Sequence, residues 1–548
     1  MFKTNSRLTR RHFLKTAIAA VGAAALPVDA AAAQDAAKYT RHNVMSDGGK
    51  KALASYAKGV EAMLKLPADH PQNWFRNAFI HVLDCPHGNW WFYVWHRGYL
   101  GYFEQTIRNL SGDDTFAMPY WDWTTLPQIP DSMFDGVLTP HDVAFEPYTS
   151  NLALFTSLLQ PALMSYWKSL NSEQRAQLNV RGYTEFDSVW NDVTGYDPHQ
   201  ADPHGISGNM AYANPCGSRF LTRDNPKLDE KTAYNVSPFV VYSGLLPTDF
   251  YNPQSQLSFN SSKTASHNSQ PDGGNVFSVL EGLAHNKVHN YIGGVGLLDP
   301  GPYGNMTNFL SPVDPIFFLH HANMDRLWDV WTRKQKRLNL PYLPTGKDLE
   351  ALSNEPFLFY VNGKGDYVGS SHAGEYFSTE KFEYNYEPGF GEKVVEPPSA
   401  SLMEKHAMQT VKGTVKGNSA SIIVPADAIQ YHLGATIGAS LVAQVTLPHP
   451  SATSSAREFD VIVGAPADMT EVAANSPYYA GTIAFFGKMM NMKMISADAT
   501  FAVPLPKAAE AFHSLAAAKS ALVNIRVVAS QRHGGKAPVL KAASIRAL

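Results

Sequence analysis

The chain contains very little cysteine and carries almost no net charge, and both shortages narrow the classes of protein it can belong to. Two cysteines, Cys85 and Cys216, occur in 548 residues, so at most one disulfide can form within the chain. Lysine and arginine number 45 against 48 acidic residues, and the net charge of -3 excludes the basic field of a nucleic-acid-binding protein. With 44% hydrophobic and 17% charged residues the composition is ordinary for a globular protein, and the length predicts two or three domains.

An apolar stretch long enough to span a membrane is lacking near the N-terminus. Arg10 and Arg11 precede Phe13, and the Ala-rich run over 17–28 is too short and too rich in small residues for a bilayer span. This order of charges, apolar run and small residues is typical of a twin-arginine signal peptide. We therefore expect a signal peptide over residues 1–33, the twin-arginine export machinery as a partner, a periplasmic or extracellular location, and no stable membrane anchor after cleavage.

Residue patterning divides the chain into a mostly helical part and a β-rich part. Apolar periodicity predicts helices over 50–65, 73–82, 90–110, 275–291 and 315–338. A Pro- and Gly-containing stretch over 391–404 predicts a linker. Beyond it, alternating runs predict strands over 421–424, 441–447, 459–463 and 524–528. The expected architecture is a mainly α domain over 34–390, a helical bundle with long loops, followed by a smaller β-sandwich over 405–548.

Six histidines fall into two groups on separate helical regions. The groups are His81, His87 and His96, and then His285, His289 and His321. His285 and His289 are four residues apart, so on a helix both side chains can reach one metal ion. His320 precedes His321 and points about 100° away around the same helix, so only one of that pair can easily face the same ion.

Carboxylates are missing from the positions where other histidine-rich metal sites need them. A hydrolytic zinc site of the H-E-x-x-H kind needs a glutamate after its first histidine, and Asn286 stands there. A di-iron bundle uses Glu-x-x-His pairs, but Glu281 lies four residues before His285. A blue-copper site needs one cysteine and two histidines around one ion. Two groups of three imidazoles fit a coupled dicopper centre better than any of these.

Other residues with metal chemistry are less informative. The remaining histidines, His267 among them, show no such grouping and are expected on the surface or in loops. Cys85 could pair with Cys216 in a disulfide, and its place two residues before His87 makes a role at the metal site a competing possibility. Four methionines could assist copper loading, although strand and core positions are their commoner use: Met489, Met490, Met492 and Met494.

Four segments together resemble the tyrosinase, catechol oxidase and haemocyanin family of type-3 copper proteins. They are C-P-H-G-N-W-W-F-Y-V-W-H-R-G-Y-L, M-P-Y-W-D-W, H-N-K-V-H-N-Y-I-G-G and S-P-V-D-P-I-F-F-L-H-H-A-N-M-D-R-L-W, within residues 74–334. The resemblance implies two copper ions with dioxygen as co-substrate, one ion held by each group of three histidines. It also implies that His321, rather than His320, is the ligand. The five residues between His81 and His87 are fewer than is usual in the family.

The resemblance also implies roles for neighbouring residues. Cys85 and His87 match the pair that forms a thioether crosslink in fungal tyrosinases and molluscan haemocyanins. Glu281 and Asn286 match the pair that holds a water for phenol deprotonation in some members, although Glu281 could be an ordinary helix carboxylate. Substrate-pocket roles fall to Phe317, packed against the last ligand, and to Phe309 or Asn308, overhanging the second ion.

The family oxidises small phenolic substrates, and its members differ in which step they perform. The implied activity is ortho-hydroxylation of monophenols and oxidation of o-diphenols to o-quinones. A catechol or o-aminophenol oxidase without the hydroxylation step is the alternative, and an oxygen carrier like haemocyanin is a further one. Tyr384-x-Tyr386 resembles the motif that closes the catalytic domain of plant-type polyphenol oxidases. In that group a C-terminal β-domain shields the site, so residues 405–548 are expected to act as a lid.

Overall fold

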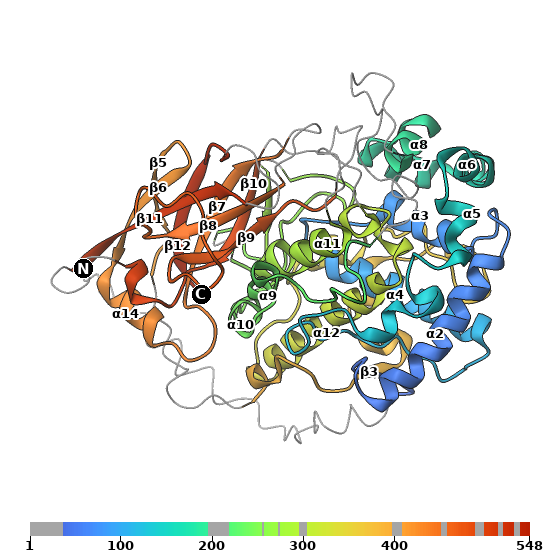
Figure 1. The fold of residues 1–548 in the computed structure, drawn as a ribbon, viewed down its shortest axis with the longest axis horizontal. Helices are drawn as coiled ribbons and strands as arrows, with labels where there is room; N and C mark the ends of the chain where they lie inside the picture. Colours follow the sequence, from blue (N-terminus) through green and yellow to red (C-terminus); the bar gives the residue numbers. More distant parts are fainter. Residues whose placement is uncertain are drawn as a thin grey trace, which may run out of the picture.

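The computed structural model describes residues 37–194, 219–254, 257–271, 274–294, 304–396, 408–450, 457–487, 498–512, 519–530 and 537–548. A helical part and a part built from β-sheets lie side by side (Figure 1). The fold class predicted from the sequence is confirmed. The signal peptide, Cys216, the four methionines and most of the expected linker lie outside the described residues, and the domain limits stay predictions.

Four helices form the centre of the helical part. They are α2 (Asp47–Lys65), α3 (Trp74–Asp84), α4 (Phe92–Ser111) and α12 (Ile316–Arg337). Four of the five predicted helices are therefore confirmed, with shifts of a few residues at their ends. The side chain of Ser46 caps α2 by accepting from the Gly49 amide. Gly112 ends α4 with a φ of 71°, a left-handed conformation that glycine adopts without a steric penalty.

Further helices and single turns complete the helical part. The α-helices are α5 (Glu146–Thr149), α6 (Leu152–Ser169), α7 (Ser172–Arg181), α8 (Phe186–Thr194), α9 (Glu230–Asn235), α10 (Pro238–Leu245), α11 (Asn286–Gly293) and α13 (Lys347–Ser353). Single turns are η1 (Asp131–Phe134), η2 (Gly136–Leu138), η3 (Val143–Phe145), η5 (Asn305–Thr307), η6 (Ser311–Val313), η7 (Ala373–Tyr376), η8 (Thr379–Phe382) and η9 (Glu392–Val394). The aromatic side chains between these helices form one continuous core.

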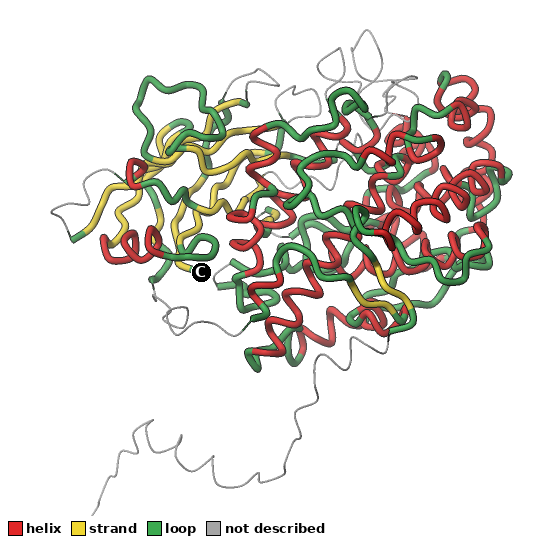
Figure 2. Tube along the Cα trace, turned by 60° about the horizontal axis from the view of Figure 1, so that its bottom comes forward, coloured by secondary structure: helices red, strands yellow, loops and turns green. Residues whose placement is uncertain are grey.

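Two five-stranded sheets form the second part, with strand orders β2-β10-β7-β12-β4 and β5-β6-β11-β8-β9. Figure 2 shows most of the strands, in yellow, gathered in this part. The strands are β2 (Asn275–Phe277), β4 (Val411–Lys412), β5 (Thr414–Lys416), β6 (Ser419–Pro425), β7 (Leu441–Pro448), β8 (Glu458–Val463), β9 (Tyr479–Ala484), β10 (Asp498–Pro504), β11 (Ser520–Ala529) and β12 (Ala542–Ala547). Buried side chains from both sheets share one core, as in a sandwich. Helix α14 (Ala426–Gly434) and turn η11 (Ala509–Ala511) complete this part.

The helix expected over 275–291 begins later than predicted. Asn275–Phe277 is strand β2, which pairs in parallel with β10 and stacks Phe277 on Phe501 with ring centroids 4.8 Å apart. A π-helix, η4 (Leu280–His285), follows and leads into α11. A Cβ added at Gly282 would lie 2.8 Å from the Phe277 side chain, so glycine permits the close packing. The sheet edge overrides the local helical pattern here because it supplies the backbone hydrogen bonds of β2.

The two ends of the helical part are joined through a buried charge network. Strand β1 (Tyr39–Arg41) pairs in parallel with β3 (Tyr384–Tyr386). Arg41 is buried and contacts Glu104 at 2.8 Å and Asp325 at 2.9 Å. The hydroxyls of Tyr384 and Tyr386 both donate to Asp325, at 2.5 Å and 2.6 Å. The two tyrosines of the predicted closing motif therefore fasten this segment to α12.

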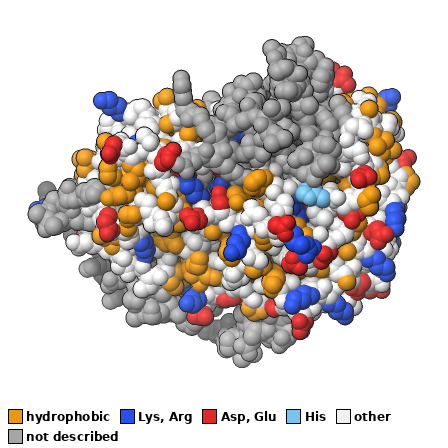
Figure 3. Space-filling model, viewed as in Figure 1, with side chains coloured by type: hydrophobic (Ala, Val, Ile, Leu, Met, Phe, Trp, Pro, Cys, Tyr) orange, Lys and Arg blue, Asp and Glu red, His pale blue; other side chains and the backbone are white. Residues whose placement is uncertain are grey.

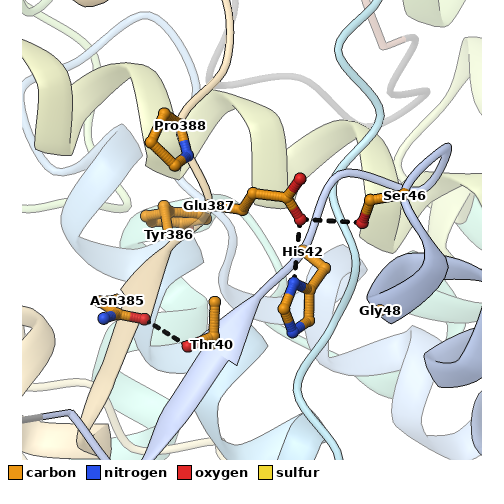
Figure 4. Close-up of a pocket in the computed structure, with 8 residues that line it drawn as sticks. All are labelled: Thr40, His42, Ser46, Gly48, Asn385, Tyr386, Glu387 and Pro388. Atoms are coloured by element: carbon orange, nitrogen blue, oxygen red, sulfur yellow. Dashed lines mark hydrogen bonds and ion pairs between the residues drawn. The ribbon is translucent and has the colours of Figure 1, made fainter. Parts of the chain in front are cut away.

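The surface adds two observations. A recess of about 420 Å³ lies beside β1 and β3, where Glu387 accepts from Ser46 at 2.8 Å and lies 2.9 Å from His42 (Figure 4). Ser46 donates to the carboxylate and not to the imidazole, so the three do not form a nucleophile triad.

On the face in Figure 3, acidic and basic side chains are interspersed. Within the described residues, no helix is long and apolar enough to cross a membrane.

Candidate metal centre

The structure brings the six sequence-predicted histidines together at the centre of the helical part. His81 lies near the end of α3, His87 in the loop after it, and His96 in the first turns of α4. His285 ends η4, His289 lies one turn into α11, and His321 lies in α12. The ring centroids of His87 and His285, one from each group, are 5.5 Å apart. Two separate helical regions therefore supply one compact site.

Hydrogen bonds orient most of these histidines so that their unprotonated ring nitrogen faces the centre of the cluster. The Nδ1 atoms of His81, His96 and His289 each lie 2.7 Å from a backbone carbonyl oxygen, those of Phe309, Phe92 and Met306 respectively. A carbonyl only accepts, so Nδ1 carries the proton and Nε2 keeps its lone pair. The Nδ1 of His285 lies 2.9 Å from the Asn286 side-chain oxygen, which fixes the same tautomer when that oxygen accepts.

The bare nitrogens converge in a way that suits a cation. The Nε2 atoms of His289 and His321 are 3.1 Å apart, and those of His81 and His96 are 3.4 Å apart. Two lone pairs at such distances repel each other unless a positive ion lies between them. Among the described residues, the buried Nε2 atoms of His87 and His285 have no hydrogen-bond partner. The donor set therefore fits nitrogen-preferring metal ions, with three imidazoles in each group.

Burial keeps these imidazoles in the neutral form that binds metal. Burial lowers the pKa of His96 and of His285 from 6.5 to about 3 in each case. Burial, with neighbouring histidines adding to it, also lowers the pKa of His81, His87 and His321 well below the usual value. The site is thus ready to bind metal at neutral pH without first losing protons.

His320 lies within reach of the second group but is held as a hydrogen-bond partner. One potential metal cluster contains His285, His289, His320 and His321. The Trp123 indole N–H donates to Nδ1 of His320 at 3.1 Å. Because indole can only donate, Nδ1 of a neutral His320 is the acceptor, so Nε2 carries the proton and offers no lone pair. This geometry favours His321 as the ligand, as the resemblance implies.

Cys85 lies against His87 in the first group. Its sulfur is 3.4 Å from the Nδ1 atom of His87, and the two join His81 in a second potential metal cluster. Burial raises the pKa of the Cys85 thiol to about 12. The thiol is therefore protonated at neutral pH, which disfavours a thiolate ligand and leaves it placed for the predicted crosslink.

Glu281 and Asn286 connect the two histidine groups to their surroundings. One Glu281 carboxylate oxygen accepts from the Gly88 amide at 2.6 Å, next to His87, and the other accepts from the Ser261 hydroxyl. Burial raises the pKa of Glu281 to about 8, and these two hydrogen bonds only partly oppose it. The Asn286 amide donates to the Ala484 carbonyl of β9 at 3.0 Å. Ser261 is a contact that sequence patterns did not reveal.

Aromatic rings line the histidine cluster. The ring centroid of Phe317 lies 4.2 Å from that of His321, and Phe309 lies 5.3 Å from His87. The Asn308 side chain instead accepts from the Leu310 amide within its own loop. Of the two residues expected to overhang the site, Phe309 is the one whose ring faces the histidines.

A ring from the C-terminal part also reaches the histidines. Phe486, just after β9, lies 4.3 Å from His289, 5.0 Å from His87 and 5.5 Å from Phe309, measured between ring centroids. It therefore stands between the two histidine groups. The sequence offered no signal for this contact, because it depends on how the sheets dock.

His267 lies in a loop, one of the two places expected for it, but it is buried rather than on the surface. His267 is 1% exposed and lies between Asp84, at 2.8 Å, and Glu355, at 2.6 Å. His432, from the C-terminal part, is likewise buried. The sequence around a single histidine in a polar segment does not reveal such carboxylate partners, because they come from distant parts of the chain.

Comparisons with known proteins agree with the geometry of the site. Residues 65–334 match the family described as "Common central domain of tyrosinase". Polyphenol oxidase II, chloroplastic, from Ipomoea batatas is 23% identical over 359 residues, 62% of this chain and 48% of that protein. Tyrosinase HcTyr1 from a Hahella species is 25% identical over 329 residues, 54% of each chain. The chain thus spans about half the length of these curated relatives.

The fold itself is similar to that of a solved plant enzyme. The structure of a latent aurone synthase, a polyphenol oxidase from its natural source, superposes with a TM-score of 0.56. The match covers 94% of this chain and 90% of that one at 19% identity, so it includes both the helical part and the sheets.

Proposed function

Because the chain belongs to the tyrosinase and polyphenol oxidase family, we propose that it is a copper-dependent phenol oxidase. It hydroxylates monophenols at the ortho position and oxidises o-diphenols to o-quinones, with dioxygen as co-substrate. The observation that carries this proposal is the convergence of bare imidazole nitrogens, with Nε2 atoms 3.1 Å and 3.4 Å apart in the two groups. Copper is the ion proposed because six imidazoles without a carboxylate ligand suit it.

Each ion would be held by one group of three histidines: His81, His87 and His96 for the first, and His285, His289 and His321 for the second. The bound pair supplies the activation of dioxygen. The protein holds the six rings, keeps them neutral and excludes water through the surrounding aromatic side chains. Phe309 and Phe317 limit the space beside the rings, which favours a flat aromatic substrate.

Hydroxylation of a monophenol needs a group that takes the phenol proton. The Glu281 carboxyl, whose pKa burial raises to about 8, can exchange a proton near neutral pH. Its contact with the Gly88 amide holds it beside the His87 loop. Asn286 keeps His285 in the tautomer whose Nε2 is free. These contacts support the monophenolase activity over a purely o-diphenol oxidase.

We further propose that the C-terminal part is a lid that must move before substrate enters. The Phe486 ring, 4.3 Å from His289, lies where a phenol would approach the histidines. Hydrogen bonds from Asn286 to Ala484 and from Asn290 to Phe485 hold this segment against α11. Export by the twin-arginine route, with copper inserted before transport, accords with a site this enclosed.

A paired substrate assay tests the proposal. Copper-loaded protein is assayed with tyrosine and with L-DOPA, before and after limited proteolysis near residues 387–405. Quinone from both substrates, increased by proteolysis, is expected. Quinone from L-DOPA alone would leave only the o-diphenol oxidase, and reversible dioxygen binding without quinone from either substrate would overturn the oxidase in favour of a carrier.

The Cys85–His87 crosslink has its own test. Forming the thioether breaks the S–H bond of Cys85 and a ring C–H bond of His87, and the two hydrogen atoms with their electrons pass to dioxygen, the proposed co-substrate. The intact reduced, metal-free protein is therefore expected to weigh about two daltons less than its sequence mass. A Cys85→Ser variant, which cannot form the bond, should match its own sequence mass. If the wild-type protein and the Cys85→Ser variant both have the mass calculated from their sequences, the crosslink is ruled out.

A further inference from the structure

A group of ionised side chains is buried beside the first histidine group and takes no part in the chemistry proposed above. Asp84, Arg181, His267 and Glu355 are 0%, 2%, 1% and 8% exposed. Burying charged side chains is unfavourable unless partners satisfy them, so a buried group of this kind indicates a structural or functional role. The contacts of each member show what that role is.

Asp84 touches the segments that carry all three histidines of the first group. It ends α3, three residues after His81 and three before His87. One of its oxygens accepts from the indole N–H of Trp95 at 2.8 Å, and Trp95 directly precedes His96. A single carboxylate therefore sets the distance between the end of α3 and the start of α4.

His267 holds the other oxygen of Asp84. Its Nε2 lies 2.8 Å from Asp84, and its Nδ1 lies 2.6 Å from Glu355. Burial alone would lower the pKa of His267, but the two carboxylates outweigh it and raise the pKa to about 9. The two carboxylates favour the protonated ring, which can donate from both nitrogens, and the side-chain nitrogen of Asn268 also lies 2.9 Å from Nε2. Its backbone carbonyl accepts from the Asn89 side chain at 3.0 Å, in the loop just after His87.

Arg181 fixes the backbone on the other side of the same loop. Its guanidinium donates to the carbonyls of Val82 at 2.9 Å and Cys85 at 2.8 Å, and to the Asn268 side chain at 3.0 Å. Two carboxylates, one imidazolium and one guanidinium sum to zero charge. Because the group is neutral overall and its hydrogen bonds are directional, it acts as a rigid support.

We propose that Asp84, His267 and Arg181 are positioning residues that hold His81, His87 and His96 in metal-binding geometry. This role rests on the proposed copper chemistry, and it is specific to the first of the two ions. The second group has different supports, the Asn286 side chain and the carbonyl of Met306. Weakening the buried charges should therefore release one ion and leave the other.

Metal stoichiometry of the full chain tests the assignment. Asp84→Asn and the milder His267→Gln are reconstituted with copper, and bound copper is titrated against a competing chelator. The wild type is expected to hold two ions per chain. Each variant is expected to hold one ion with unchanged affinity and the other about 10- to 100-fold more weakly, the usual effect of removing an outer partner of a ligand.

Two sets of reference proteins separate this role from a general loss of stability. Asp460→Asn breaks another mostly buried ion pair, with Lys231 at 2.5 Å, in the C-terminal part, and it should keep both ions. His87→Ala and His289→Ala each remove a ligand from one group. The EPR spectrum of the single Cu(II) left in Asp84→Asn should match that of His87→Ala and differ from that of His289→Ala.

The outcomes are distinct. Two ions held with wild-type affinity in Asp84→Asn and His267→Gln, or parallel loss of both ions, would overturn the positioning role. A spectrum like that of His289→Ala would overturn it as well. If the wild type itself binds no copper, the proposed function fails, and the assignment fails with it.

Discussion

The buried ion pair between Lys287 and Glu458 offers a sharp test of how the C-terminal sheets are attached to the metal centre. Lys287 lies in α11, two residues from His289, and Glu458 begins β8. Their charged atoms are 2.6 Å apart, and their side chains are 1% and 0% exposed. Replacing Glu458 by Gln removes the carboxylate in contact with the buried Lys287 ammonium and leaves Asp460 as an acidic neighbour. Breaking such a pair from one side costs about 3–5 kcal/mol.

A double-mutant cycle separates the charge from the packing. Glu458→Gln and Lys287→Met are each expected to lower the free energy of unfolding by about 3–5 kcal/mol, because each removes the opposite charge that a buried group contacts here. The double variant Lys287→Met with Glu458→Gln removes both charges and should be clearly more stable than either single variant. Urea unfolding followed by circular dichroism measures all three. An exposed pair of equal length, Lys263 and Asp348 at 2.6 Å, is the matched control.

The control defines what would refute the reasoning. Asp348→Asn should cost less than about 1 kcal/mol, since that pair is 39% and 43% exposed and solvent already satisfies both groups. If Glu458→Gln costs no more than Asp348→Asn, the interface is not dry. If the loss in the double variant equals the sum of the single losses, the two groups do not interact, and the contact does not attach the sheets to α11.

Three further predictions concern the site. Phe486→Ala should raise o-diphenol oxidation by uncleaved protein toward the level reached after proteolysis, and unchanged latency would exclude the ring as the block. Glu281→Gln should lower the kcat for tyrosine about 100-fold or more while L-DOPA oxidation changes little, as expected when a proton acceptor is lost. An equal loss of activity with both substrates would argue for a structural role of Glu281. The metal-free protein should lose stability as the pH falls below 6.5. In the unfolded chain His96 and His285 then become protonated, whereas in the folded protein, where their pKa values are about 3, they stay neutral. At pH 5 this amounts to about 2 kcal/mol for each histidine, measurable by urea unfolding at several pH values.

Much of the helical part could be predicted because its signals are local. The apolar periodicity of α2, α3, α4 and α12 reflects a buried face on each helix. It can be recognised in the sequence without knowing which element packs against that face. The helix expected at Asn275 was wrong because β2 is formed by pairing with β10, more than 220 residues later in the chain. Pairing at that separation leaves no trace in the three residues themselves.

The sequence by itself determined the chemistry available to this protein: six imidazoles in two groups, no carboxylate ligand among them, and aromatic neighbours. Spacing within a helix is enough to bring His285 and His289 onto one face, because the geometry of the helix is fixed. The tertiary structure alone decided how those imidazoles are used. It set their tautomers through the carbonyls of Phe309, Phe92 and Met306. It also buried His267 between two carboxylates and brought Phe486 over the rings, because such contacts join segments whose proximity depends on the packing of the whole chain.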